Sequence, residues 1–155
     1  MRLHVISIAS HAPDWAAAAC RDYARRMPRH LAIEFIDLPP PRPRPPDKAR
    51  RLAAEAERLR EAAGKSAVRV ALDERGTLWT SRQLASRMEE WMMAGGDAAY
   101  LIGGPDGHDP ALCRAAGERW SLGALTLPHA LVRVIVAEQL YRAWTLLSGH
   151  PYHRD

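Results

Sequence analysis

The feature of this sequence that most constrains its fold is a regular alternation of short apolar runs with longer amphipathic segments. The short runs are rich in Val, Ile, Leu and Ala and have the length of strands. Five strands are predicted, at residues 2–9, Leu31–Leu38, Ala67–Leu72, Ala98–Ile102 and Leu122–Leu127. Strands that alternate with helices form mainly parallel sheets, because the helices make the crossover connections. The sequence therefore predicts an α/β fold, a mainly parallel sheet with flanking helices, in a single domain of 155 residues.

The predicted helices carry apolar residues at helical spacing and have recognisable ends. Thr80 and Gln83 have the spacing of a capping box, while Asp47 and Asp109 are expected to cap two other helices. The strand Leu31–Leu38 alternates apolar and polar residues, so it is expected toward one edge of the sheet. The helical segments are Asp14–Met27, residues 48–63, residues 81–94, residues 110–116 and Ala130–Leu147.

Composition bounds the class of protein more than its function. Hydrophobic residues make up 47% of the chain and charged residues 26%, which is typical of a soluble globular protein. No apolar run approaches the roughly 18 residues of a membrane span, and the start lacks the apolar core of a secretory signal. In the helical segments, Trp15 lies on an apolar stripe, and Cys20 and Cys113 are expected to be free thiols that pack in the core. A cytoplasmic location is expected, without a membrane partner.

The most biased segment is Pro39–Arg51, which we call the basic arm. It begins with six prolines in eight residues, PPPRPRPP, which prevent sheet pairing and favour an extended loop. With a net charge of +4, the chain has nucleic acid as its leading candidate partner. The arm is interpreted as a loop that binds phosphates. The alternative is a stiff, solvated linker. The residues predicted to bind RNA are Arg42, Arg44, Arg50 and Arg51.

Three predicted strands end in apolar or glycine-rich residues: Leu72, Ile102 with Gly103 and Gly104, and the run Leu122–Leu127. In a parallel sheet these ends share one edge, which is where ligands bind. None of them supplies a dinucleotide-binding GxGxxG or a P-loop lysine. A site of backbone groups and small apolar side chains suits an adenine ring better than a triphosphate.

The final helix, Ala130–Leu147, is apolar over an unusually broad face, which Leu131 and Val134 widen further. This favours a dimer contact over a core within one chain. His129 precedes the helix and either touches a ligand or caps the helix. His150 and His153 lack a neighbouring cysteine or carboxylate cluster, so no metal site is expected.

Several motifs together resemble the RlmH family of bacterial SPOUT-class methyltransferases. They are LIGGPDG (101–107), WSLGALTLPHALVRVIVAEQLYRAW (120–144) and HPYHRD (150–155), with APDW (12–15) and YARRMP (23–28) near the start. The resemblance implies a SPOUT-type fold with a trefoil knot in the C-terminal third, a homodimer, and S-adenosylmethionine (SAM) as methyl donor. It also implies methylation of N3 of a pseudouridine in 23S rRNA. Relatives have a Gly/Lys-rich loop where this chain has PPPRPRPP.

By this resemblance, SAM should be held largely through backbone groups at the three strand ends. The residues implied are Leu72, Gly103, Gly104, Leu122, Gly123, Ala124, Leu125, Thr126 and Leu127. In the tail, Tyr152 is expected to stack on or hydrogen-bond the target nucleotide, and Arg154 to bind a phosphate or carbonyl oxygen. His153 would polarise the base or accept its proton.

Two alternatives to these interpretations of the tail and of the whole protein remain open. The tail can serve only to pack the dimer, without touching the nucleotide. The whole protein can be a non-catalytic ribosome-binding or assembly factor that uses the same basic surface. In either case the expected partner is 23S rRNA or the ribosome.

Overall fold

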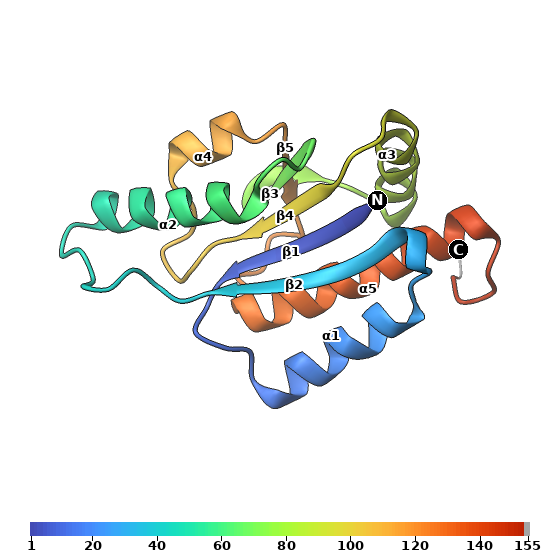
Figure 1. Cartoon of the computed structure of the whole chain (residues 1–155), viewed down its shortest axis with the longest axis horizontal. Helices are drawn as coiled ribbons and strands as arrows, with labels where there is room; N and C mark the ends of the chain where they lie inside the picture. The colour runs from blue at the N-terminus through green and yellow to red at the C-terminus, as the bar shows by residue number, and fades with distance from the viewer. Residues whose placement is uncertain (154–155) are drawn as a thin grey trace.

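Five parallel strands form one sheet in the computed structural model, which describes residues 1–153. The strand order is β2-β1-β4-β3-β5, and every pairing between neighbours is parallel (Figure 1). The predicted sheet is therefore confirmed, including the edge position of the second strand. The strands are β1 (Arg2–Ile8), β2 (Ala32–Leu38), β3 (Val68–Leu78), β4 (Ala98–Ile102) and β5 (Glu118–Ser121).

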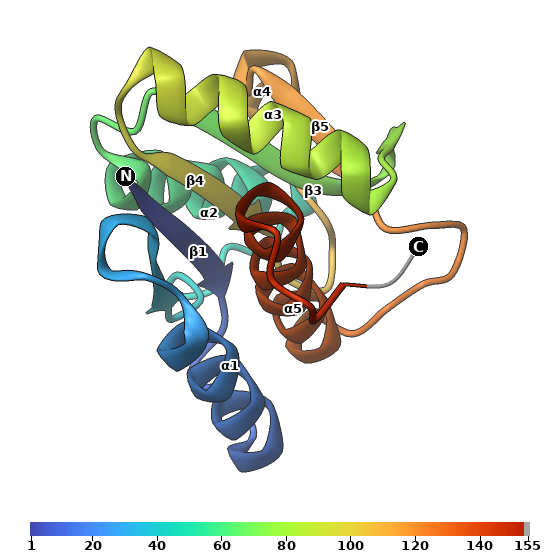
Figure 2. The same cartoon turned by 90° about the vertical axis from the view of Figure 1, so that its right-hand side faces the viewer.

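Helices cover both faces of this sheet. Buried side chains of α1, α3 and α5 pack on one face, and those of α2 and α4 pack on the other. Figure 2 shows α1, α3 and α5 from one end of the molecule. The helices are α1 (Asp14–Arg26), α2 (Lys48–Ala63), α3 (Ser81–Ala94), α4 (Pro110–Ala115) and α5 (His129–Ser148), with a 3₁₀ turn, η1, at Arg29–Leu31.

Strands β1 and β4 bury most of their side chains because both faces of the sheet are covered there. In β4, Tyr100 belongs to the core cluster beneath α3 and α5, whereas Leu101 belongs to the cluster beneath α2. In β1, Val5 and Ile6 divide between the two clusters in the same way. This alternation anchors the strands whose carboxyl ends form the candidate site.

The predicted position of the last strand, Leu122–Leu127, is wrong. β5 is Glu118–Ser121, and residues 122–127 form a loop that leads to α5. The chain leaves the sheet where the Ser121 hydroxyl bonds the backbone of Gly123, whose φ of 131° favours glycine. Leu125 is 77% exposed in this loop, whereas Leu122 at its start still packs against the core.

The third strand also continues further than predicted. β3 runs on past Leu72 to Leu78, and its register with β5 shifts between Leu72 and Thr77. Gly76 makes this possible, because a Cβ there would lie 2.7 Å from the carbonyl of Arg119. The absence of a side chain at Gly76 therefore allows the two strands to approach closely.

The helix ends follow the sequence signals with one exception. Thr80 and Gln83 form the predicted capping box, and the Asp109 side chain accepts from Ala111 N–H. Asp47 occupies the N-cap position of α2 but makes no side-chain cap, so that prediction is wrong.

Two core predictions from α1 divide. Cys20, like Cys113, is a buried free thiol, as predicted. Trp15 was expected in the core but is 55% exposed, because α1 turns Ala16 and Cys20 inward instead. No helix among residues 1–153 is long and apolar enough to cross a membrane. The trefoil knot stays a prediction.

Candidate cofactor cleft and C-terminal tail

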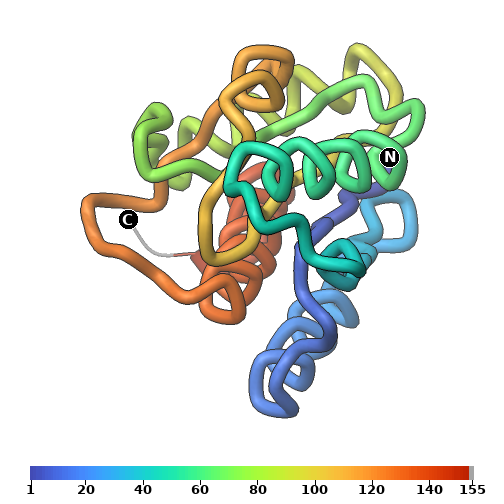
Figure 3. Tube along the Cα trace, turned by 90° about the vertical axis from the view of Figure 1, so that its left-hand side faces the viewer, coloured from blue at the N-terminus to red at the C-terminus, as the bar shows by residue number. Residues whose placement is uncertain are grey.

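A cleft of about 1090 Å³ opens beside residues 72–75 in the middle of β3 and at the carboxyl ends of β4 and β5. Figure 3 looks at this end of the molecule, where α2, the β4–α4 connection and the loop before α5 lie close together. The structure brings all three predicted strand ends to this cleft. Of the nine residues predicted to hold a cofactor, only Ala124 does not line it; the eight that do are Leu72, Gly103, Gly104, Leu122, Gly123, Leu125, Thr126 and Leu127.

The glycine loop, residues 103–107, forms one wall of the cleft. It is closed by a hydrogen bond of 3.0 Å from Gly107 N–H to the Gly104 carbonyl. A Cβ on Gly103 would lie 2.6 Å from the Gly107 carbonyl oxygen, closer than side chains are found. The loop is thus folded so tightly that its first position accepts only glycine, which leaves backbone groups at the cleft wall.

Asp73, the residue after Leu72, is a cleft residue that the sequence reasoning missed. Its carboxylate accepts from the Arg119 guanidinium at 2.6 Å and from Arg75 N–H at 3.0 Å. Burial alone would raise the pKa of Asp73, but these two hydrogen bonds outweigh burial and hold it below the usual value. Its place directly after a buried strand was a signal that could have identified it.

His108 also lines the cleft and was missed. Its Nε2 lies 3.0 Å from the carbonyl oxygen of Leu101, so this nitrogen carries the hydrogen and donates it. Burial lowers the pKa of His108, which favours the neutral imidazole. Its Nδ1 is buried and has no partner within the described residues. No sequence pattern pointed to this side chain.

His129 is the first residue of α5 and lines the cleft. The N-cap of this helix is Pro128, and no side chain caps it. Of the two interpretations of His129, contact with the cleft therefore fits the structure, and capping does not.

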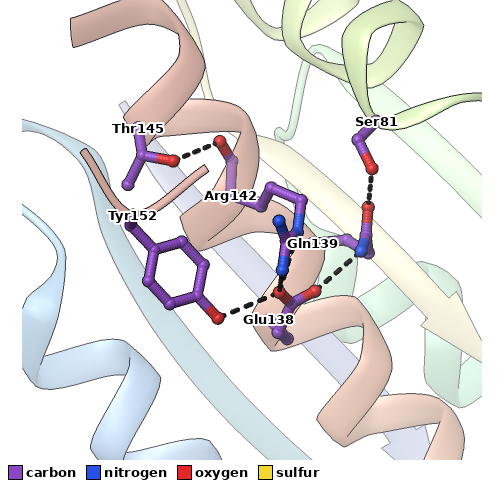
Figure 4. Close-up of polar contacts among 6 residues, drawn as sticks. All are labelled: Ser81, Glu138, Gln139, Arg142, Thr145 and Tyr152. Atoms are coloured by element: carbon purple, nitrogen blue, oxygen red, sulfur yellow. Dashed lines mark hydrogen bonds and ion pairs between the residues drawn. The ribbon is translucent and has the colours of Figure 1, made fainter. Parts of the chain in front are cut away.

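The C-terminal tail packs against the end of α5 in a polar network (Figure 4). The Tyr152 hydroxyl donates to Glu138 Oε1 at 3.0 Å, and Arg142 donates to the same oxygen through Nε at 2.9 Å and Nη2 at 2.5 Å. Gln139 donates to the other carboxylate oxygen at 2.7 Å and accepts from the Ser81 hydroxyl at 2.6 Å. The network therefore joins the tail, α5 and α3.

The Tyr152 side chain is held on several sides. Its ring meets that of Tyr141 edge-on at 4.6 Å, and the Arg142 guanidinium lies 5.0 Å from its centre. The pKa of Tyr152 is raised, first by burial and then by hydrogen bonds with Tyr23 and Glu138. The phenol is therefore protonated at neutral pH and its hydrogen is already donated. The i,i+4 pair of Glu138 and Arg142 was the available sequence signal.

In Figure 1 the tail follows the end of α5 that is farther from α2 and from the β4–α4 connection, both of which contribute residues to the cleft. α5 begins at the cleft with His129, and its 20 residues span roughly 30 Å before the tail begins. Neither Tyr152 nor His153 lines the cleft of its own chain. Arg154, the third residue predicted to act in catalysis, lies outside the described residues.

The arginines of the basic arm are of two kinds: three are exposed, and one is largely buried and hydrogen-bonded within the protein. Arg42, Arg44 and Arg50 are exposed, as RNA contacts require. The Arg51 side chain is only 17% exposed, and its guanidinium bonds the carbonyls of Pro45 and Pro46. Arg51 therefore shapes the arm rather than extending from it. Among residues 1–153, no group of three His, Cys, Asp or Glu side chains is arranged to hold a metal ion.

Two solved structures share this fold. A probable methylase family protein from Haemophilus influenzae covers 99% of this chain and 70% of its own, with a TM-score of 0.60 and 15% identity. TrmJ from Z. mobilis covers 94% of this chain and 70% of its own, with a TM-score of 0.57 and 16% identity. A family model described as "Predicted SPOUT methyltransferase" matches residues 1–153. The fold and the family model define the class: this is a SPOUT methyltransferase.

Relatives of known name narrow the class to one family. Proteins from Verminephrobacter eiseniae and Paracidovorax citrulli are 50% and 48% identical, and each alignment covers 100% of both chains. A protein from Hahella chejuensis is 45% identical over the same full coverage. All three carry the name Ribosomal RNA large subunit methyltransferase H. The chain belongs to the RlmH family, and the resemblance read from its motifs is confirmed.

Proposed function

We propose that this protein is a SAM-dependent methyltransferase that methylates N3 of a pseudouridine in bacterial 23S rRNA, in the cytoplasm and on the ribosome. The observation that carries the proposal is the convergence of three predicted strand ends on one cleft in a member of the RlmH family. The names of its relatives supply the rRNA substrate. The pseudouridine and its N3 position come from the motif resemblance.

The lining of the cleft supports SAM as its ligand. Leu72, Leu122 and Leu127 offer apolar side chains to an adenine ring, and the glycine loop offers backbone groups to its polar edge. A Cβ at Gly103 would clash with the Gly107 carbonyl and so disturb the tight turn that exposes those groups. Bound SAM supplies a methyl group on a cationic sulfur, so the protein needs to align the acceptor nitrogen and remove its proton.

We propose that the active site forms only in a homodimer, with the cleft of one chain completed by the tail of its partner. Within one chain the two parts stay apart: Tyr152 bonds Glu138, which lies roughly 14 Å along α5 from His129 at the cleft, and neither Tyr152 nor His153 lines the cleft. The contact surface is the outer face of α5, where Leu131, Val134 and Ile135 remain incompletely buried. Leu125, 77% exposed at the mouth of the cleft, extends this apolar surface.

In this composite site the tail residues have separate roles. The phenol of Tyr152 is protonated and bonded to Glu138, so it orients the tail and packs against the nucleotide rather than removing a proton. His153 is the proposed acceptor of the N3 proton, since a neutral imidazole is the usual general base near neutral pH. Arg154 is proposed to bind a phosphate or carbonyl oxygen of the nucleotide. The exposed arginines of the arm, Arg42, Arg44 and Arg50, bind phosphates away from the reaction.

A composite site is tested by mixing two inactive variants. Gly103→Val disables the cleft but keeps the tail, and His153→Ala disables the tail but keeps the cleft. If subunits exchange freely, about half of the dimers are mixed and each has one intact site, so roughly a quarter of wild-type activity returns. Methyl transfer from labelled SAM to ribosomes from cells lacking the protein measures this. Two variants that stay inactive after mixing would refute the composite site.

The alternative function is a ribosome-binding or assembly factor without catalysis. The two differ in their response to S-adenosylhomocysteine, the product of SAM, which stabilises only a protein that binds it. An enzyme shows a saturable rise in melting temperature with this ligand. A protein without that rise, which still binds ribosomes, is the assembly factor.

A further inference from the structure

Two arginines of α2 hold the basic arm in place. The guanidinium of Arg58 donates to the carbonyl of Pro39, where the arm leaves β2. The guanidinium of Arg51 donates to the carbonyls of Pro45 at 3.2 Å and Pro46 at 2.9 Å, just before α2 begins. The proline-rich stretch between these two points is stiff, so its fixed ends determine where Arg42 and Arg44 project.

Arg51 also reaches the cleft. Its Nη2 lies 3.5 Å from Oδ2 of Asp106, which belongs to the glycine loop and lines the cleft. Figure 3 shows the start of α2 beside the connection that contains this loop. One guanidinium therefore contacts the arm through two carbonyls and the glycine loop through a carboxylate.

The charges around Arg51 make it difficult to replace. Glu55, one turn further along α2, has an oxygen 3.4 Å from the position that a Cβ on Gly104 would take. Burial, and then the charge of Asp106, raise the pKa of Glu55, while Arg51 lowers it. One carboxyl group, Asp106, thus belongs to the glycine loop and a second, Glu55, faces it, and Arg51 supplies a positive charge that acts on both and cannot be lost by deprotonation.

We propose that Arg51 and Asp106 are positioning residues that couple RNA binding at the arm to cofactor binding at the glycine loop. This inference rests on the proposed function and goes beyond it. A ligand on either side restricts the same guanidinium, so the second ligand has less ordering to impose and binds more tightly. Such coupling is reciprocal, because each ligand changes the affinity of the other by the same factor.

The coupling factor is a ratio of two dissociation constants. Ribosomes from cells lacking the protein are titrated with it, once without and once with saturating S-adenosylhomocysteine, and bound protein is measured by co-sedimentation. The wild-type protein is expected to bind about fivefold or more tightly with the ligand present. Because the factor is a ratio, a variant's change in intrinsic affinity cancels.

The variants Arg51→Gln and Asp106→Asn each remove one side of the contact and should bring the factor close to one. Combining them should change it no further, since both act through one interaction. Arg60→Gln is the matched control: Arg60 is on the same helix and pairs only with exposed Glu57 at 3.2 Å, so the factor stays at its wild-type value. This selective loss distinguishes coupling from a general effect on α2.

Each outcome tests the coupling, and one of them also tests the proposed function. Wild-type protein that binds both ligands with a factor of one overturns the coupling and leaves the proposed function intact. A factor that persists in both variants does the same, and if Asp106→Asn fails to fold, Arg51→Gln alone decides. Wild-type protein that does not bind S-adenosylhomocysteine overturns the proposed function and the coupling together.

Discussion

The Tyr152 hydroxyl donates to the Glu138 carboxylate at 3.0 Å, which ties the C-terminal tail to the outer face of α5. Replacing Tyr152 with Phe removes this bond but keeps the ring contacts with Tyr141. Glu138→Gln keeps an oxygen that can accept from the phenol but weakens the bidentate pair with Arg142. We therefore expect Tyr152→Phe to lower the free energy of unfolding by about 1 kcal/mol. The rate of methyl transfer should fall by more than this loss of stability explains.

The check is a double-mutant cycle on kcat and on the free energy of unfolding. If the tail acts through the Tyr152–Glu138 bond, the double variant is no slower than the worse single variant. Fully additive losses in kcat would show that Glu138 acts independently of the tail.

Gly103 is the position in the cleft where the backbone leaves least room. Gly103→Ala places a methyl group 2.6 Å from the Gly107 carbonyl oxygen, so the glycine loop must shift. We expect a loss of roughly 1–3 kcal/mol in stability and at least a tenfold weaker affinity for S-adenosylhomocysteine by calorimetry. Gly117→Ala is the control, since nothing lies within 4 Å of its added methyl group. Equal affinity in Gly103→Ala and wild type would mean that the cofactor does not use this loop.

Much of the site followed from the sequence because the carboxyl ends of parallel strands must meet at one edge. Leu72, Gly103 and Leu127 were placed together on that ground alone, and they line one cleft. The strand before α5 could not be placed in the same way. The true edge strand, Glu118–Ser121, has the polar sequence ERWS and pairs only with β3, whereas the more apolar run after it faces the cleft and solvent.

The side-chain partners were harder still to foresee. Arg133, a charged residue in the apolar last helix, is 3% exposed and lies 2.8 Å from Asp37 of β2. That contact depends on how α5 is rotated over the sheet, which the broad apolar face does not specify. Arg51 was expected to bind RNA, and its carbonyl partners depend on the fold of the proline-rich arm.

The pair of Asp73 and Arg119 predicts a dependence of stability on pH. Because the folded-state pKa of Asp73 lies below its usual value of 3.8, ionised Asp73 stabilises the protein above about pH 4. This contribution is lost as pH falls through the folded-state pKa. Arg119→Gln should therefore be less stable than wild type at pH 7, and the difference should shrink below about pH 4.

Chemical denaturation across this pH range measures the difference. Arg60→Gln serves as a control, because its exposed pair with Glu57 contributes about 0.5 kcal/mol or less at any pH. A gap between wild type and Arg119→Gln that is constant from pH 7 to pH 3 would contradict the assignment to Asp73.

The arm arginines predict a change in salt dependence. Arg42, Arg44 and Arg50 are exposed and bind phosphates by the proposal, so each Ala substitution should reduce the slope of log K against log salt by about 0.7 on single-stranded RNA. Ribosome binding measured between 50 and 300 mM KCl, roughly the range over which such slopes are resolved, gives the slope. Arg29, exposed on η1 away from the arm, is the control. A triple variant with the wild-type slope would exclude the arm from RNA contact.

The outer face of α5 predicts that dimerisation and catalysis are lost together. Ile135→Glu places a charge on the face that carries Leu131 and Val134, where burial in a dimer would leave the carboxylate without a partner. Because Ile135 is only half-buried within one chain, the monomer should remain folded, with far-ultraviolet circular dichroism like that of wild type. Sedimentation equilibrium should show a monomer, and methyl transfer should fall at least a hundredfold, since no partner tail reaches the cleft. S-adenosylhomocysteine should still bind, because the cleft belongs to one chain. An active monomer would show that one chain holds the complete site and would overturn the composite site.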